Sequence, residues 1–142
     1  MNPAITTYNL SHSFAKRNVL RSLSFSIEKG DFFIIIGPNG SGKTTLMKLM
    51  AGILKPQNGQ LEILGLPNRS YTPKALAREV AFVPQRLPLD LPFSVGQAVL
   101  LGRAPYQGAL GIEGEMDLKI AEQAMKFTEV DHLNSLNIGQ LS

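Results

Sequence analysis

Two segments near the amino terminus have the hydrophobic pattern of β-strands. In residues 20–27, Leu23, Phe25 and Ile27 alternate with serines, and this period of two is typical of a strand with one buried face. Residues 5–10 also have a strand-like composition, and the basic segment 15–18 would form the loop between the two strands. The pattern therefore predicts an antiparallel pair.

A different pattern follows at residues 31–36, where Asp-Phe-Phe-Ile-Ile-Ile is apolar without alternation. A continuous apolar run is typical of a strand that is buried on both faces of a parallel sheet. Residues 80–83 have the same character and predict a second buried strand. Between these segments we expect a helix from 43 to about 54, because its apolar residues recur every three to four positions, and a strand at 60–64.

The second half of the chain has helical periodicity. A short helix at 73–78 is expected, with Thr72 as its N-cap and proline at its first position. Helices are also expected at 94–101 and at about 113–128, the latter with Leu118, Ala121 and Met125 on one face. The sequence thus predicts an α/β portion, residues 1–92, followed by a helical portion, residues 93–142.

Composition excludes several classes of protein. The 14 basic residues outnumber the 11 acidic ones by only three and are scattered, so no nucleic-acid-binding surface is indicated. Cysteine is absent, which excludes disulfides and thiolate metal sites, and neither His12 nor His132 has a partner at metal-ligand spacing. No apolar run approaches the roughly 20 residues of a membrane-spanning helix, and the first residues lack the features of a secretion signal.

The strongest chemical signal is a glycine-rich loop at residues 37–44. Its sequence, Gly-Pro-Asn-Gly-Ser-Gly-Lys-Thr, matches G-x-x-x-x-G-K-[ST] at every fixed position. The loop lies between the apolar run and the first predicted helix, as its mechanism requires. Glycines allow the backbone to wrap closely around a phosphate, so that successive N–H groups and the helix N-terminus point at the anion. The sequence therefore predicts a nucleotide-phosphate site.

The residues that follow this loop distinguish among the protein families that contain such a loop. Thr45-Leu46, then Ala51-Gly52 and Pro56-x-x-Gly59, resemble the nucleotide-binding domain of an ATP-binding cassette (ABC) transporter. GTPases and small-molecule kinases share the loop but not this continuation. The resemblance covers essentially the whole chain. It implies an α/β fold, namely a partial P-loop NTPase with an N-terminal antiparallel β subdomain, the phosphate-loop strand and helix, and part of the helical subdomain.

The resemblance also implies ATP and Mg²⁺ as cofactors and assigns their ligands. The phosphates would be held by Gly37, Pro38, Asn39, Gly40, Ser41, Gly42, Lys43, Thr44 and Thr45. Mg²⁺ would contact the Thr44 hydroxyl and the amide oxygen of Gln85. Phe14 occupies the position of the aromatic residue that stacks on adenine, and Tyr8 is the weaker candidate for that role.

The last residues of the sequence determine what we expect for ATP hydrolysis. Leu141-Ser142 matches the start of the family's signature motif, and the Walker B aspartate, the catalytic glutamate and the switch histidine would follow further along. No catalytic residue is therefore assigned in this chain. We expect a chain cut inside the motif, with weak Mg·ATP binding at best, no turnover alone, and apolar sheet edges left uncovered.

The segment 101–106, Leu-Gly-Arg-Ala-Pro-Tyr, resembles the corresponding segment in the ATPases of importers for iron–siderophore complexes, haem or cobalamin. Such an ATPase would work with the transmembrane permease subunits of the transporter, and it would form a homodimer or pair with a second ATPase subunit. It would lie peripherally on the cytoplasmic face of the plasma membrane. Two alternatives stay open. One is a non-catalytic nucleotide-binding module, and the other is the ATPase subunit of another class of ABC transporter.

Overall fold

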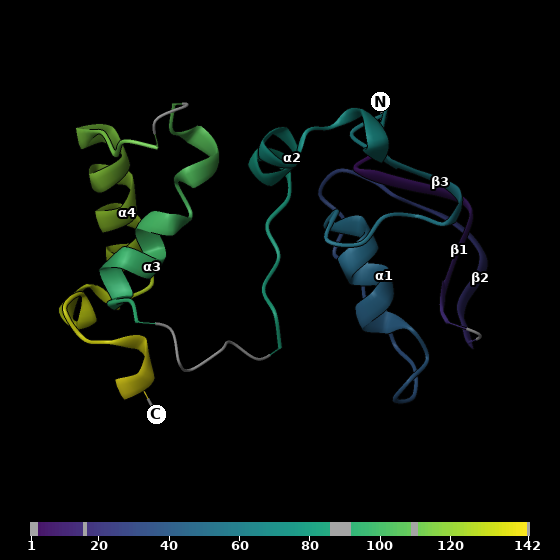
Figure 1. Ribbon diagram of the computed structural model, residues 1–142, viewed down its shortest axis with the longest axis horizontal. Coiled ribbons are helices and arrows are strands. Elements are labelled where there is room, and N and C mark those ends of the chain that lie inside the picture. Colours follow the sequence, from purple (N-terminus) through teal and green to yellow (C-terminus); the bar gives the residue numbers. More distant parts are fainter. Residues whose placement is uncertain (1–2, 16, 86–91, 109–110, 142) are drawn as a thin grey trace. The chain divides into compact units, whose positions relative to one another are not determined.

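The computed structural model describes residues 3–15, 17–85, 92–108 and 111–141. The chain forms two compact units, Met1–Phe82 and Val83–Ser142 (Figure 1). The first unit contains the sheet and the phosphate loop. The second contains the longer helices of the carboxyl-terminal half. Each unit has its own packing and is described separately.

The first unit is built on a four-stranded sheet with the order β2-β1-β3-β4. Its strands are β1 (Ile5–Phe14), β2 (Arg17–Ile27), β3 (Asn58–Ile63) and β4 (Leu66–Pro67). All three pairings are antiparallel, and β1 lies in the centre. The predicted antiparallel pair is confirmed, with both strands longer than expected, and the third predicted strand is confirmed at slightly different bounds.

Serine side chains complete the hydrogen bonding where the β1–β2 register shifts. Asn9 and Ser22 have positive φ at these irregularities. The Asn9 N–H donates to Ser24 Oγ at 2.8 Å, and the Ser22 N–H donates to Ser11 Oγ at 2.9 Å. The serines that alternate with apolar residues in the sequence therefore have a second role, because they satisfy backbone donors that the bulged ladder leaves unpaired.

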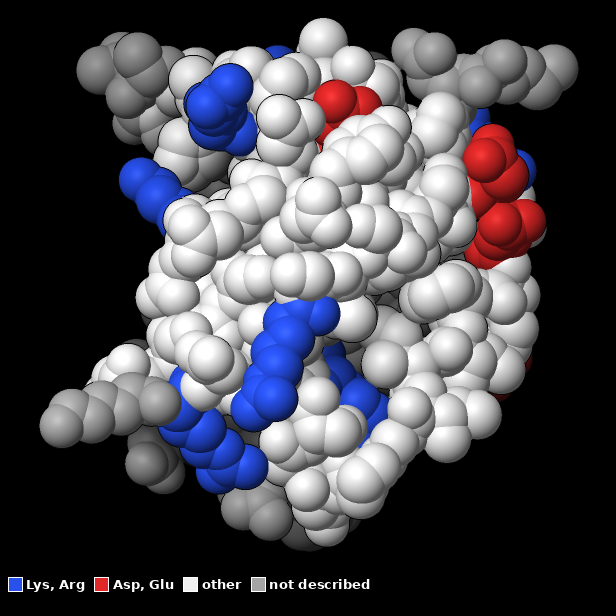
Figure 2. Space-filling model, turned by 90° about the vertical axis from the view of Figure 1, so that its right-hand side faces the viewer, with Lys and Arg blue, Asp and Glu red and all other residues white. Residues whose placement is uncertain are grey.

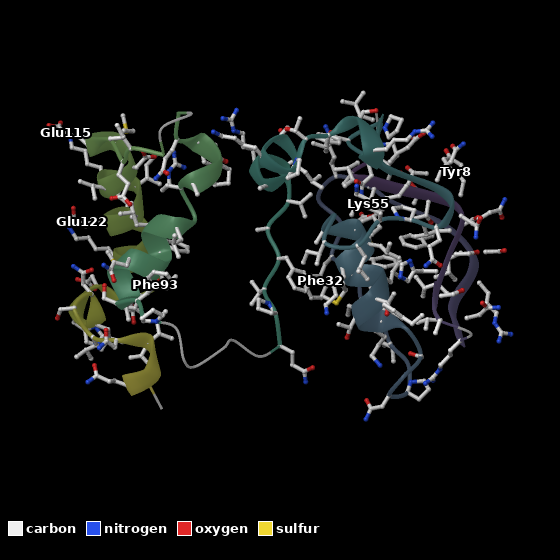
Figure 3. All side chains as sticks on the ribbon, in the orientation of Figure 1. Tyr8, Phe32, Lys55, Phe93, Glu115 and Glu122 are labelled. Atoms are coloured by element: carbon white, nitrogen blue, oxygen red, sulfur yellow. The ribbon has the colours of Figure 1, made fainter. Side chains whose placement is uncertain are left out.

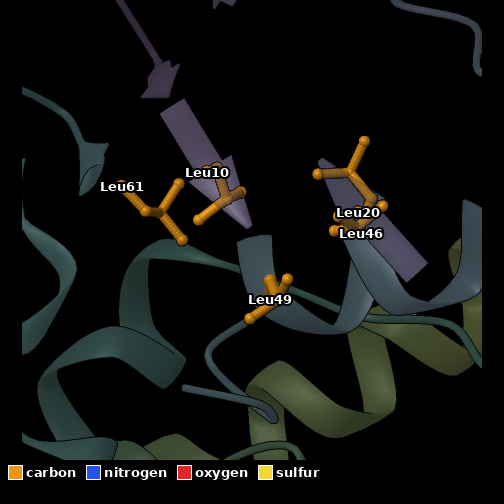
Figure 4. Close-up of a cluster of buried hydrophobic side chains, with 5 residues drawn as sticks. All are labelled: Leu10, Leu20, Leu46, Leu49 and Leu61. Atoms are coloured by element: carbon orange, nitrogen blue, oxygen red, sulfur yellow. The ribbon is translucent and has the colours of Figure 1, made fainter. Parts of the chain in front are cut away.

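Five leucines attach the helix α1 (Lys43–Met50) to this sheet. Figure 4 shows them in one cluster, with three from the strands and two from the helix: Leu10, Leu20, Leu61, Leu46 and Leu49. None is more than 6% exposed. Burial of each such side chain stabilises the fold by about 1.5–3 kcal/mol relative to the exposed state, so this cluster is the main apolar contact of the first unit.

The predicted buried strand at 31–36 is wrong. The segment is extended but belongs to no sheet, since none of the described residues pairs with it. Only one face packs: the Phe33 ring stacks on Phe25 at 5.4 Å, and Ile35 packs against the leucine cluster. The opposite face is exposed, with Phe32 at 91%, and Figure 3 shows Phe32 projecting outward from the first unit. The segment is apolar on both faces, but neighbouring residues cover only one of them.

The second predicted buried strand, at 80–83, is wrong for the same reason. No described strand pairs with it, and Val83 is 85% exposed. The first predicted helix is also shorter than expected, because Gly52 adopts a φ of +71° and ends it. The Ile53 N–H donates to the Lys48 carbonyl at 2.9 Å, which is the bond that closes a Schellman-type helix end. The helix α2 (Pro73–Glu79) forms as predicted, with Thr72 Oγ1 accepting from the Ala75 N–H at 3.1 Å.

The second unit contains α3 (Val95–Leu101) and α4 (Glu115–Phe127), close to the predicted ranges. Ser94 and Gln97 form a reciprocal capping box at the start of α3. On α4, Ala121 and Met125 are buried, whereas Leu118 is 53% exposed, so the predicted apolar face is narrower than expected. Short 3-10 helices occupy Asn68–Ser70 in the first unit, and Ala104–Tyr106, Asp131–Leu133 and Ile138–Gln140 in the second. Across the described residues, no helix has both the length and the apolar composition to cross a membrane.

Gly59 provides a test of the contact between β3 and β1. Both Gly59 and Gly30 have positive φ, but a Cβ on Gly59 would overlap the backbone of Tyr8 and Asn9, whereas a Cβ on Gly30 would meet nothing within 4 Å. We expect Gly30→Ala to lower the free energy of unfolding by about 1–2 kcal/mol through backbone strain alone. Gly59→Ala should cost about 1–3 kcal/mol more, through the steric overlap. Urea denaturation followed by circular dichroism measures both, and equal losses would contradict the close approach of the strands.

Asp117 provides a pH-dependent test of the second unit. The Gly114 N–H and the Arg103 guanidinium both donate to its carboxylate, at 3.2 and 3.0 Å, and they lower the pKa of Asp117 below its ordinary 3.8. Its stabilising contribution is therefore present above that value and is lost as the pH falls through the lower folded-state pKa. Asp117→Asn should destabilise α4 at neutral pH, with the difference from wild type vanishing in acid. Glu113→Gln, in the exposed segment that precedes α4, should show no such convergence in acid unfolding monitored by circular dichroism.

Candidate nucleotide-binding site

The glycine-rich loop leads from the extended segment into the first turn of α1. Gly40 and Gly42 have φ of +79° and +96°, which is the left-handed region that favours glycine. Gly42 is the N-cap of α1, and no side chain caps this end of the helix. The first N–H groups of α1 therefore stay available to an anion, which the helix dipole also favours.

Lys43 holds the loop in a closed curve. Its Nζ donates to the carbonyls of Gly37 and Pro38, at 2.7 and 2.8 Å, so the ammonium group lies across the mouth of the loop. An ammonium group has three donors, and these two bonds leave one for a further acceptor. Lys43 can thus brace the loop and contact a phosphate oxygen at the same time.

The loop rests directly on the start of β2. A Cβ on Gly42 would lie 2.8 Å from Leu20 Cδ2 and 3.0 Å from both Val19 Cγ1 and the Val19 carbonyl oxygen. A side chain at this position would push the loop off the strand. Gly42 is therefore required by two independent constraints, its left-handed backbone and this close approach.

The remaining loop residues are placed for ligand contact. Asn39, Ser41 and Thr44 are exposed, and Thr45 is half-buried in the first turn of α1. The Thr44 hydroxyl is an oxygen ligand of the kind that Mg²⁺ takes, and Mg²⁺ usually completes its shell with phosphate oxygens and water. No cluster of three or more His, Cys, Asp or Glu residues occurs in the described parts of the chain. The donor set thus fits a metal that arrives with a phosphate rather than one held by protein alone.

The base-binding candidate lies at the end of β1 nearest to this loop. Phe14 is 50% exposed, the edge of its ring contacts buried His12 with centroids 4.9 Å apart, and its register partner on β2 is Arg17. Tyr8 is equally exposed, but Figure 3 shows it on the outer side of the sheet, away from α1. The predicted adenine contact of Phe14 stays a prediction, with an accessible ring to support it.

Gln57 joins the end of the α1 segment to the strand that carries Phe14. Its side-chain amide pairs with both backbone groups of Ser13: the Ser13 N–H donates to Oε1 at 2.7 Å, and Nε2 donates to the Ser13 carbonyl at 2.9 Å. Ser13 Oγ in turn bonds Asn18 Oδ1 at 2.7 Å. The backbone on the amino-terminal side of Phe14 is therefore held by hydrogen bonds from two other segments.

Two site predictions involve the second unit. Gln85 is exposed, near the start of that unit, and its Mg²⁺ contact stays a prediction. Leu141 is 39% exposed and donates its N–H to the Ile138 carbonyl at 3.0 Å. Ser142 lies outside the described residues. The phosphate-loop residues and Phe14 are thus the part of the predicted site that the structure brings together.

An apolar groove of about 460 Å³ begins behind the phosphate loop. One end is formed by the loop and Lys43, and the rest by Leu20, Leu23, Phe25 and the segment 33–36. Apart from Lys43 and the loop its walls are apolar and offer little to neutralise a triphosphate, so the anion-binding surface is the mouth of the loop. The groove lies between the extended segment and β2, on the side where the Phe33 ring faces Phe25.

Sequence reasoning missed Arg17. A Cβ on Gly40 would lie 3.4 Å from Arg17 Nη2, so the guanidinium lies against the tip of the loop. The available signal was the basic character of residues 15–18, which we interpreted only as a connecting loop, although Arg17 follows Phe14 by three positions.

Comparison with known proteins identifies the family. The ABC transporter family profile matches residues 20–142, which include the whole phosphate loop. The hemin import ATP-binding protein HmuV of Thermobifida fusca is 34% identical over 94% of this chain and 46% of its own length. The achromobactin transport ATP-binding protein CbrD of Dickeya dadantii is 35% identical over 98% of this chain and 52% of its own length.

A solved structure agrees with these sequence matches. A metal-chelate type ABC transporter in an inward-facing conformation superposes with a TM-score of 0.79 at 30% identity, covering all of this chain and 51% of that one. The chain spans about half the length of the relatives it matches. From the profile match, together with a phosphate loop built as described above, it follows that this chain belongs to the ABC transporter family.

Proposed function

We propose that this chain binds Mg·ATP and serves as the ATP-binding component of an importer for iron–siderophore complexes, haem or cobalamin. The observation that carries the proposal is the loop in which Lys43 Nζ closes on the Gly37 and Pro38 carbonyls at the uncapped start of α1. Backbone N–H groups, the helix dipole and one ammonium group converge there on a single anion site.

Each part of the site has a distinct task in nucleotide binding. The loop amides and Lys43 bind the β- and γ-phosphates, because they are donors and carry positive charge. Thr44 contributes a hydroxyl ligand to Mg²⁺, and Gln85 contributes its amide oxygen. Phe14 supplies a π-face for adenine. Mg²⁺, when bound with the nucleotide, would neutralise charge on the phosphate oxygens.

Binding without hydrolysis is the activity we propose for the 142-residue chain alone. ATP hydrolysis needs a positioned water, which a carboxylate commonly orients, and the sequence assigns no catalytic carboxylate to this chain. The same observation favours the second candidate function, a non-catalytic nucleotide-binding module. The two candidates differ in whether nucleotide binding is coupled to transport.

The transported substrate and the partners are inferred from similarity. Two relatives are named for hemin and achromobactin transport, and a structural relative is a metal-chelate type transporter. Together with the Gly-Arg-Ala-Pro-Tyr segment at 102–106, these names favour a metal chelate, such as an iron–siderophore complex, haem or cobalamin, over the substrates of other ABC transporter classes. We place the protein on the cytoplasmic face of the membrane, bound to permease subunits and a second ATPase subunit.

Substitution of Lys43 tests nucleotide binding directly. Lys43→Ala removes a charged donor to the phosphates and should weaken Mg·ATP binding about 10- to 100-fold, as expected for a charge-assisted hydrogen bond. Lys48→Ala, in the last turn of the same helix, is the matched control and should leave the affinity unchanged. Isothermal titration calorimetry measures both. Equal affinities of Lys43→Ala and wild type would remove the phosphate loop from the proposed site.

Uptake measurements test the transport role. In cells that make the protein with its natural partners, Lys43→Ala should reduce the uptake of radiolabelled iron supplied as haem or as a ferric siderophore, or the uptake of labelled cobalamin, at least tenfold. Lys48→Ala should transport at the wild-type rate. Unchanged uptake of all three substrates in the Lys43→Ala strain would favour a different transporter class or the non-catalytic module.

A further inference from the structure

Arg17, the first residue of β2, lies against the tip of the phosphate loop. Its Nη2 is 3.4 Å from the position that a Cβ on Gly40 would occupy, so the guanidinium lies beside the loop at Gly40. The same stretch of β2 supports the loop at Gly42, through Val19 and Leu20. The start of β2 is thus a wall of the site, and Arg17 is the charged part of that wall.

This guanidinium has no counter-ion in the described part of the chain. Both ion pairs found there, Arg103–Asp117 and Lys126–Glu122, belong to the second unit, and Arg17 is exposed. Lys43 is bonded only to carbonyls. Figure 2 shows lysine and arginine side chains in both the upper and the lower half of the face that it presents, whereas the acidic side chains in clear view lie in the upper half. Two cations beside the phosphate loop, neither with a carboxylate partner among the described residues, favour an anion there.

Arg17 also links the two parts of the proposed nucleotide site. Its register partner across the end of the hairpin is Phe14, and its guanidinium lies beside the loop at Gly40. A ligand with a planar base on Phe14 and phosphates at the loop mouth would pass beside this guanidinium. Arginine presents its N–H donors in a fixed fork that matches phosphate oxygens in a bidentate arrangement.

We propose that Arg17 is a phosphate-binding residue of this site, a second cation that acts with Lys43 on the polyphosphate of the bound nucleotide. This inference rests on the proposed function, because it needs a nucleotide in the loop. It adds a ligand from the β1–β2 hairpin, outside the G-x-x-x-x-G-K-[ST] motif. The hairpin therefore contributes to phosphate binding as well as to base binding.

The test separates phosphate contacts from base contacts with two probes, Mg·ATP and Mg·tripolyphosphate, titrated calorimetrically into the 142-residue chain. Arg17→Ala should weaken both about tenfold, near the lower limit for a hydrogen bond to a charged group because the site is exposed. Phe14→Ala should weaken ATP alone, because tripolyphosphate has no base. Arg21→Ala is the matched control, with the same residue type on the same strand, and should change neither affinity.

Salt dependence distinguishes ligand contact from a bracing role of Arg17 at Gly40. A direct charge contact is screened by salt, so the loss of affinity in Arg17→Ala should shrink as the ionic strength rises, and Arg17→Lys should recover part of the tripolyphosphate affinity. A side chain that only braced the loop would give a loss independent of salt. Far-UV circular dichroism of each variant checks that the sheet and α1 are retained.

Three results would overturn the inference while the proposed function stands. The first is that Arg17→Ala binds tripolyphosphate with wild-type affinity. The second is that Arg17→Ala loses affinity for ATP alone, which would place Arg17 at the base or ribose. The third is that Arg21→Ala loses as much affinity as Arg17→Ala. Failure of the proposed function looks different. In that case wild type would bind neither probe, or Lys43→Ala would bind both as tightly as wild type, and Arg17 would then have no polyphosphate to contact.

Discussion

The close packing of α1 against the sheet is the contact on which the nucleotide site depends. Leu46 and Leu49 on the helix and Leu10, Leu20 and Leu61 on the strands bury one another, and this fixes where the helix begins relative to β2. Gly42 can then approach Val19 and Leu20 with no room for a side chain between them. An apolar contact far from any charge therefore positions the N–H groups that face the anion, as is common where a rigid scaffold carries a binding loop.

Local sequence signals predicted those parts of the fold that depend on local interactions. The alternation in β2 and the Thr72 cap are each set by residues a few positions apart, and both occur as expected. The phosphate loop belongs to the same group, because its glycines and Lys43 act within eight residues. Signals of this kind can be interpreted without knowing which distant segments of the chain pack against one another.

The errors come from interactions between distant segments. Residues 31–36 have the composition of a strand with neighbours on both sides, but composition cannot say whether those neighbours exist, and here only Phe25 and the leucine cluster cover one face. Leu118 was assigned to the apolar face of α4 by spacing alone and lies at its exposed margin. Arg17 was missed for the same reason, since its contact with Gly40 joins residues 23 positions apart and leaves no periodic trace.

The hydrogen bonds between Gln57 and Ser13 have a consequence for chain length. From the phosphate loop the backbone runs through α1, ends at Gly52 in a fixed turn, and reaches Gln57, which binds both backbone groups of the residue before Phe14. The number of residues between Lys43 and Gln57 thus sets the spacing between the phosphate loop and Phe14. An insertion or deletion within 51–56 would alter that spacing, and Gly52 restricts the side chains as well, because a Cβ there would overlap Leu76, so both the length of this connecting segment and its glycine are constrained.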